Sequence, residues 1–184
     1  MEHFIKILES GTSEEKIKIL ETLASSDDFE IIKKMIGCLD DPDIKVRGEA
    51  FSSLILNKNK ISRLLNESLN SENKNIRGFA ALVLANRNDT STIPSIINLV
   101  KDEHFMVRAF AFGALGHLRA KEATDVVHNG ILDSNIEVRK SALQAMINLK
   151  EEISEKEILE ISKEKDSELE QLIVKLKKGG PEGI

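Results

Sequence analysis

The stretch LDDPDIKVRGEAFSSLILN, residues 39–57, places two aspartates, a proline and a third aspartate directly before a run that opens with Val46 and Arg47. Related sequences occur at residues 100–118, VKDEHFMVRAFAFGALGHL, and at residues 132–149, LDSNIEVRKSALQAMINL. A motif that returns along one chain indicates a repeated structural unit, because each unit of a stacked array needs the same buried contacts. The fold therefore depends on the spacing of this motif.

The arginine of the motif sets the length of the unit, and its position is named the anchor here. It recurs at steps of 30, 31 and 31 residues, as Arg47, Arg77, Arg108 and Arg139. One further step in each direction reaches Lys16 and Glu170, so six units cover most of the chain. Their approximate bounds are residues 1–25, 28–57, 59–87, 91–119, 121–149 and 154–178. We predict one repeat domain over residues 1–178 and a flexible tail over residues 179–184.

Residues at constant offsets from the anchor indicate helices. Three positions after the anchor the residues are mostly small, and seven positions after it they are large and apolar, which is one buried stripe of a helix. The first set is Ile19, Ala50, Ala80, Ala111, Ala142 and Ile173, and the second is Leu23, Leu54, Leu84, Leu115, Met146 and, as an exception, Lys177. Apolar residues twelve and eight positions before the anchor predict a preceding helix. We predict an all-α fold, an α-solenoid of about six stacked helical hairpins.

Residue types that cap helices stand four positions before the anchor. They are Thr12, Asp43, Asn73, His104, Asn135 and Asp166. All except His104 have side chains that accept from the first free N–H groups of a helix, which stabilises it by ~1 kcal/mol relative to Ala. The aspartates before Val46 therefore mark a turn and the start of the second helix of a hairpin.

Acidic residues stand six positions before the anchor in several units. They give the pairs Asp41 with Arg47, Asp102 with Arg108 and Asp133 with Arg139, and Pro94 lies fourteen residues before Arg108. With these residues the chain resembles the HEAT-like repeat family of the phycobilisome-lyase type. A unit of that family has a short helix, an Asp-containing turn and Val-Arg at the start of a second helix. The resemblance covers about residues 1–178 and implies an armadillo-like superhelix.

The anchor residues have two interpretations. They form either a structural ladder of ion pairs between turn and helix, or a row of arginines that binds a ligand. Ser71 removes the acidic partner expected for Arg77, which makes Arg77 a candidate for contact with a partner. Lys16 and Glu170 replace arginine in the outer units, and such degeneracy is expected for end repeats that face water.

The composition argues against several functional classes. The 184 residues are 41% hydrophobic and 31% charged, as in globular domains. A net charge of −5 and the absence of Trp and Tyr oppose a basic or base-stacking surface for nucleic acid. The single cysteine, Cys38, the lack of a secretory-signal pattern and the lack of an apolar stretch of bilayer length lead us to expect a cytoplasmic protein without a membrane partner.

The expected binding surface is the face of the second helices opposite their buried stripe, because second helices line the concave side of such solenoids. In the two central units this face carries small and apolar residues, which suits the docking of a helix or a strand. The candidate partner-binding residues are Arg77, Gly78, Phe79, Leu82, Met106, Ala109, Phe110, Gly113 and His117. The alternative for Phe79 and Phe110 is packing against a neighbouring repeat.

The pattern contains no cluster suited to catalysis, and we expect no cofactor and no metal. The histidines occupy unrelated positions of the repeat, as His3, His104, His117 and His128. Four glycines fall on second helices, namely Gly48, Gly78, Gly113 and Gly116. Because glycine costs a helix about 1 kcal/mol relative to Ala, each is expected where another backbone approaches closely, with a neighbouring repeat favoured over a partner.

These observations predict a non-enzymatic protein-protein interaction module, a scaffold, adaptor or assembly factor with another protein on its concave surface. One alternative is an accessory subunit similar to the phycobilisome lyases, acting on a tetrapyrrole-carrying protein. Nucleic-acid binding ranks third. A homo-oligomer is also possible, because an apolar groove could accept a second copy of the chain.

Overall fold

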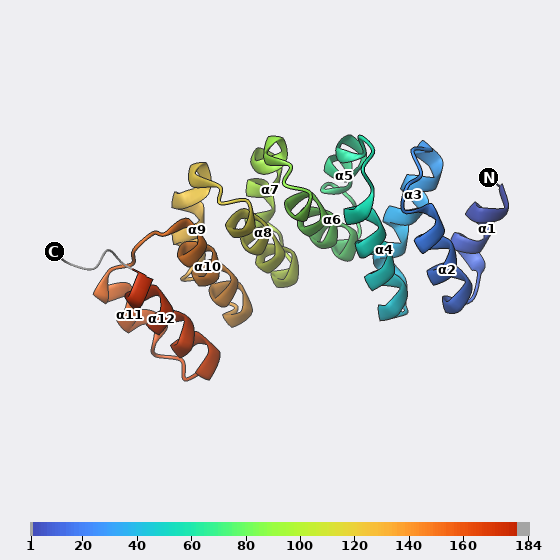
Figure 1. Ribbon diagram of the computed structural model, residues 1–184. Helices are drawn as coiled ribbons and strands as arrows, with labels where there is room; N and C mark the ends of the chain where they lie inside the picture. Colours follow the sequence, from blue (N-terminus) through green and yellow to red (C-terminus); the bar gives the residue numbers. More distant parts are fainter. Residues whose placement is uncertain (1, 180–184) are drawn as a thin grey trace. The chain divides into compact units, whose positions relative to one another are not determined.

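Helices form all of the regular structure in the described part of the chain. The computed structural model describes residues 2–179, and over this range it contains α-helices and short 3-10 helices but no strand. The residues divide into two compact units, Met1–Arg87 and Asn88–Ile184. The helices are labelled along the chain in Figure 1. The all-α prediction is therefore confirmed.

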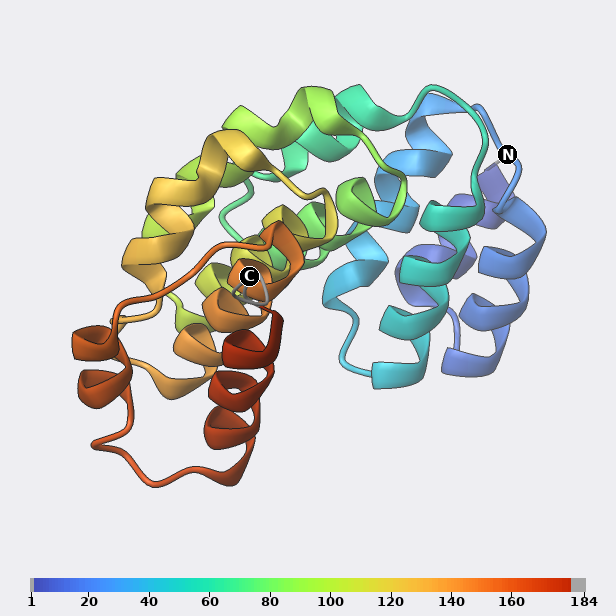
Figure 2. The same cartoon turned by 60° about the vertical axis from the view of Figure 1, so that its left-hand side comes forward.

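The first unit consists of three helical hairpins. They are α1 (Glu2–Ser10) with α2 (Ser13–Leu23), α3 (Phe29–Gly37) with α4 (Ile44–Leu56), and α5 (Ser62–Ser68) with α6 (Lys74–Asn86). A 3-10 turn, η1 (Cys38–Asp40), joins α3 to the loop before α4. The first helices α1, α3 and α5 contact one another in succession, and so do the second helices α2, α4 and α6. Both views show α2 beside α4 (Figure 1, Figure 2).

The second unit repeats this arrangement. Its hairpins are α7 (Ile93–Asn98) with α8 (Phe105–His117), α9 (Thr124–Gly130) with α10 (Ile136–Leu149), and α11 (Glu155–Ile161) with α12 (Ser167–Gly179). The 3-10 turns are η2 (Thr90–Thr92), η3 (Leu99–Lys101) and η4 (Lys121–Ala123). The second helices α8, α10 and α12 pack side by side in that order. Stacked hairpins in each unit confirm the predicted α-solenoid.

The repeated apolar positions form the core. The alanines three positions after the anchor are fully buried in the four inner hairpins, and so are the large residues seven positions after it. Small side chains allow neighbouring second helices to approach, and large ones fill the space beside them. In the first hairpin Ile19 is only partly buried, whereas Ile173 at the same offset in the last hairpin is buried.

One helical glycine marks the closest approach of two second helices. A Cβ atom on Gly116 of α8 would lie 2.7 Å from the Cα and 2.9 Å from the Cβ of Ala145 on α10. These distances are shorter than real Cβ contacts, so a side chain at residue 116 would push the helices apart. A neighbouring repeat therefore explains Gly116, as the sequence predicted. Gly48, by contrast, has nothing within 4 Å of its Cβ direction.

The capping residues start the second helices as predicted. The side chains of Thr12, Asp43, Asn73, Asn135 and Asp166 each accept from a backbone N–H in the first turn of the helix that follows. Thr12 and Glu15 form a reciprocal capping box. His104 makes no side-chain cap bond; its Nδ1 lies 3.6 Å from the Asp102 carboxylate.

The last described helix ends at Gly179, the first residue of the predicted tail, and residues 180–184 lie outside the described part of the chain. Within the described residues, no helix is both long enough and apolar enough to cross a membrane.

Candidate functional site: the anchor ladder and the face of the second helices

Each anchor arginine holds the turn of its own hairpin. The Nη1 atom of Arg47 donates to the carbonyl oxygens of Asp41 and Pro42, at 2.7 and 3.1 Å. The same two bonds, to the residues six and five positions earlier, are made by Arg77, Arg108 and Arg139. The guanidinium groups therefore share one pose, in which Nη1 bonds the turn and the opposite edge, Nε with Nη2, points away from it.

The carboxylate six positions before the anchor pairs with the anchor residue of the preceding hairpin, not with that of its own. The Nε and Nη2 atoms of Arg108 each donate to one oxygen of Asp133, both at 2.9 Å. Lys16 pairs with Asp41 at 2.7 Å, and Arg139 pairs with Glu164. In all three cases the acid lies 25 residues after the cation, in the next hairpin. The ladder therefore links successive hairpins within each unit.

The same aspartates also shape their own turns. Asp41, Asp102 and Asp133 each accept from the backbone N–H two residues later, at 2.9 Å. Burial alone would raise the pKa of Asp133, but hydrogen bonds from Arg108 and from the N–H of Asn135 outweigh this and lower it. The bond with Asp133 raises the pKa of Arg108. Both groups are therefore held in their charged forms.

This geometry corrects the expected pairing within a unit. Asp41 does not pair through its carboxylate with Arg47, nor Asp133 with Arg139, because each arginine meets only the backbone oxygen of its own turn. Arg47 lies one hairpin before Ser71. Ser71 therefore occupies the position from which a carboxylate would pair with Arg47. The expectation that Ser71 deprives Arg77 of an acid is therefore wrong, and the anchor residue that lacks a carboxylate opposite it is Arg47.

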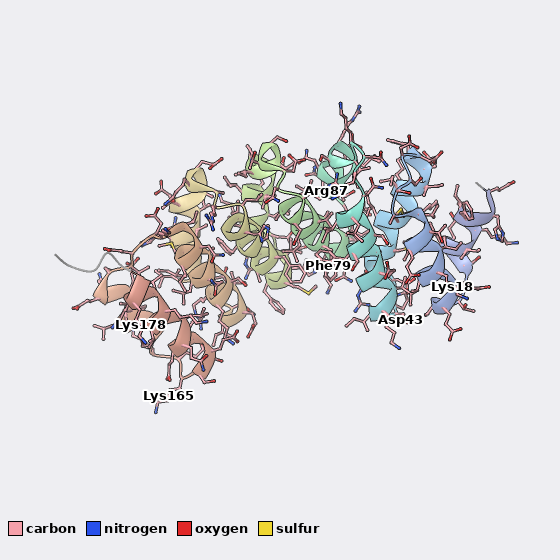
Figure 3. The ribbon with its side chains drawn as sticks, in the orientation of Figure 1. Lys18, Asp43, Phe79, Arg87, Lys165 and Lys178 are labelled. Carbon is pink, nitrogen blue, oxygen red and sulfur yellow. The ribbon has the colours of Figure 1, made fainter. Side chains whose placement is uncertain are left out.

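In the first unit, the exposed face of the second helices carries a group of apolar side chains. The rings of Phe51 on α4 and Phe79 on α6 meet edge to face, with centroids 6.2 Å apart and planes at 63°. Figure 3 labels Phe79 on α6. Leu82 is partly exposed, and Leu56, nine positions after the anchor, is 61% exposed. The contact with Phe51 supports the reading that Phe79 packs on a neighbouring repeat.

Two members of this face were not among the predicted site residues. Leu56 occupies the same offset as His117, so the repeat pattern contained the signal for it. Phe51 lies four positions after the anchor, on the flank of the helix, and only the packing of α4 against α6 brings it beside Phe79. Gly78 is buried, so it offers no surface to a partner.

In the second unit, the remaining predicted residues all lie on α8. Met106 and Phe110 are partly exposed, and Gly113 and His117 are exposed. Ala109 is buried, with only 8% of its surface accessible, which corrects the expectation that it contacts a partner. Four of the five residues on α8 are thus at least partly exposed.

Two titratable residues away from these faces, His128 and Cys38, make contacts within the fold. His128 lies 2.5 Å from the carboxylate of Glu157, which links α9 to α11. Cys38 is buried, and burial raises the pKa of its thiol to about 11. Within residues 2–179, no group of three or more His, Cys, Asp or Glu is placed to hold a metal ion.

Comparisons with known proteins support the repeat architecture. Residues 61–147 match the family model of HEAT repeats. No curated protein matches the chain. One engineered protein of known structure is 16% identical, with a TM-score of 0.57 over 99% of this chain and 98% of that chain. A second engineered protein is 19% identical, with a TM-score of 0.53 over 97% of each chain.

A designed armadillo repeat protein, solved in complex with the peptide (KR)4, is also similar. It is 14% identical, with a TM-score of 0.53 over 96% of this chain and 98% of that chain. Likeness at this level of identity concerns the fold. It confirms the HEAT-like and armadillo-like architecture that the sequence predicted.

Proposed function

We propose that this chain is a non-enzymatic protein-protein interaction module, a scaffold, adaptor or assembly factor that binds its partner on the exposed face of the second helices. The observation that best supports this is the apolar group on α4 and α6, formed by Phe51, Leu56, Phe79 and Leu82. When a partner covers apolar side chains that the fold leaves in contact with water, the free energy of the complex is lowered.

The surface of α8 supports the same proposal. Met106 and Phe110 offer flexible and aromatic contact area, which is enriched at protein interfaces. The exposed Gly113 has no side chain, so the backbone of a bound segment can approach α8 closely at that residue. His117 adds a polar group at the end of the helix.

The architecture is compatible with this mode of binding. A designed armadillo repeat protein of similar fold is in complex with a peptide. We extend to this chain only the general mode, in which a stack of helical hairpins recognises an extended or helical segment of another protein.

Photo-crosslinking with paired variants tests the proposal. A photoreactive amino acid at residue 56 should crosslink to one partner in a lysate, and Leu82→Asp should remove that product. Leu159→Asp is the matched control, because Leu159 is 71% exposed on the first helix α11. The proposal is wrong if the product persists in Leu82→Asp, or if Leu159→Asp removes it equally while thermal melts show both variants folded.

The alternatives give different results in the same set of samples. An accessory subunit of the phycobilisome-lyase type would change the absorbance spectrum of an added tetrapyrrole in a saturable way. A nucleic-acid-binding protein would shift DNA or RNA on a gel with a strong dependence on salt. Either result, together with no crosslink from residue 56, would replace the protein-binding proposal.

A further inference from the structure

One position of the anchor ladder has its cation but lacks the acid. Arg47 is fixed by Nη1 to the carbonyl oxygens of Asp41 and Pro42, as the other anchor arginines are. Within residues 2–179, its Nε and Nη2 atoms have no hydrogen-bond partner and the residue forms no ion pair. The bonds of Nη1 therefore fix the orientation of the Arg47 guanidinium, while its Nε and Nη2 atoms have no acceptor among the described residues.

The equivalent position in the second unit shows what this edge can bind. Arg108, in the same pose, holds both oxygens of the Asp133 carboxylate through Nε and Nη2. A planar, bidentate contact of this kind is the strong form of an arginine-carboxylate interaction. Since Arg47 shares the pose, its free edge has the geometry for a carboxylate at the place where Ser71 stands.

A different set of residues joins the two hairpins at this step. The carboxylate of Asp40 accepts from the side-chain amides of Asn73 and Asn75, the latter at 2.6 Å. This link connects η1 with the start of α6, so the two hairpins are joined here without an ion pair from Arg47. Arg47 still bonds the turn of its own hairpin through Nη1.

Ser71 also borders a surface pocket of about 260 Å³. Ile36 and Leu64 contribute apolar surface to it, and Lys33, Glu67, Ser68, Asn70 and Ser71 contribute polar groups. In the second unit, the corresponding pocket is lined by both Arg139 and its acid Glu164. A ligand whose carboxylate reaches Arg47 can thus place neighbouring apolar atoms in the pocket that Ser71 borders.

We propose that Arg47 and Ser71 form a binding site for a carboxylate side chain, Asp or Glu, of a partner peptide. The bound carboxylate takes the place that Asp133 occupies beside Arg108, accepts from Nε and Nη2 of Arg47, and receives the hydroxyl hydrogen of Ser71. The inference rests on the proposed function, because it takes the ligand from a protein. It places this contact at the hairpin turns, away from Leu56 and Leu82.

The complete positions of the ladder indicate which chemical group the ligand should carry. Where the acid is present, the chain uses Asp41, Asp133 and Glu164, so both lengths of carboxylate side chain fit the position. Asp43 interacts electrostatically with Arg47, and Glu67 lines the pocket. A third carboxylate, Glu72, is adjacent to Ser71 and exposed. Replacing it with Gln should leave the site intact or strengthen binding to it.

The test is an NMR titration of the arginine Nε–H signals of the full chain. The probe is the peptide acetyl-Ala-Leu-Glu-Leu-Ala-amide, and its control has Gln in place of Glu. The Arg47 signal, assigned by its loss in Arg47→Lys, should shift in a saturable way with the Glu peptide only. In Ser71→Asp the apparent affinity should fall about tenfold, because an internal carboxylate competes for the arginine.

Ser71→Asn is the matched control for size, since it removes the hydroxyl without adding charge, and its affinity should fall less than that of Ser71→Asp. The Arg108 signal reports on an occupied position and should not move. The inference is overturned by no saturable shift at millimolar peptide, by equal shifts with the Gln peptide, by tighter binding of inorganic phosphate, or by unchanged affinity in Ser71→Asp. None of these results bears on crosslinking from residue 56, so the two proposals fail separately.

Discussion

The guanidinium of Arg108 on α8 holds the Asp133 carboxylate of the next hairpin through two hydrogen bonds of equal length, 2.9 Å each. Both side chains are mostly buried, with 15% and 14% of their surfaces exposed. Asp133 also accepts from the N–H of Asn135. One carboxylate therefore joins two hairpins and fixes the turn of its own, so the charge of Asp133 couples stability to pH.

The first prediction concerns this pH dependence. The pKa of Asp133 is lower in the folded chain, so its contribution to stability is present above the unfolded pKa, near 3.9, and is lost as pH falls through the lower folded value. Asp133→Asn should cost about 2 kcal/mol at pH 7, where a charged hydrogen bond becomes a neutral one. Urea unfolding of both proteins from pH 7 to pH 3 measures the difference.

The difference between wild type and Asp133→Asn should begin to shrink below pH 4, because the carboxyl of the unfolded chain is protonated there while that of the folded chain, with its lower pKa, is still charged. Glu67→Gln is a suitable control, since Glu67 pairs with Arg63 on the surface of one helix, where such pairs contribute about 0.5 kcal/mol or less. A difference for Asp133→Asn that stays constant down to pH 3 would contradict the assigned role of the charge.

The second prediction fills the incomplete position of the ladder. Ser71→Asp should supply the acid that Arg47 lacks and should raise the free energy of unfolding by about 1 kcal/mol, as a partly exposed charged pair does. Ser71 already accepts from the N–H of Asn73 at 3.2 Å, and Asp or Asn can make the same bond. Ser71→Asn should therefore change stability less than Ser71→Asp in urea unfolding, and the reverse order would refute the account.

The third prediction concerns the single thiol. Cys38 is buried, its sulfur lies 3.9 Å from the carbonyl oxygen of Leu8, and burial raises its pKa to about 11. At pH 8 the side chain is therefore a protonated thiol, and only the thiolate reacts with an aromatic disulfide reagent. Labelling of the folded chain should be far slower than labelling in concentrated urea. Fast labelling of folded protein would place Cys38 at the surface.

The fold could be predicted from the sequence because the same residue types recur at the same offsets in successive units. Ala80, Ala111 and Ala142 each occupy the same offset, and all three are buried. The partners of the ladder were not predictable in the same way. The offset of six residues between Asp133 and Arg139 suggested a pair within one hairpin, whereas side-by-side packing of second helices brings Asp133 to Arg108.

The candidate surface was predicted in part. The helical angle correctly placed Leu82 and His117 outside the core, but it could not distinguish the buried Gly78 and Ala109 from their exposed neighbours. Burial of a small residue depends on how closely the next helix approaches. That distance cannot be predicted from the position of the residue within its own helix.

The fourth prediction uses two helical glycines as a matched pair. Gly116→Ala should destabilise the chain by about 2 kcal/mol, because the new methyl group would lie 2.7 Å from the Cα of Ala145 and would separate α8 from α10. Gly48→Ala should stabilise it by about 0.5–1 kcal/mol, because Gly48 is exposed in α4 with nothing within 4 Å of the added atom and Ala favours the helix. Chemical unfolding of the two variants beside wild type measures both effects. Equal effects of the same sign would mean that helix propensity alone sets the cost, and that the close contact of α8 with α10 is not what requires glycine at residue 116.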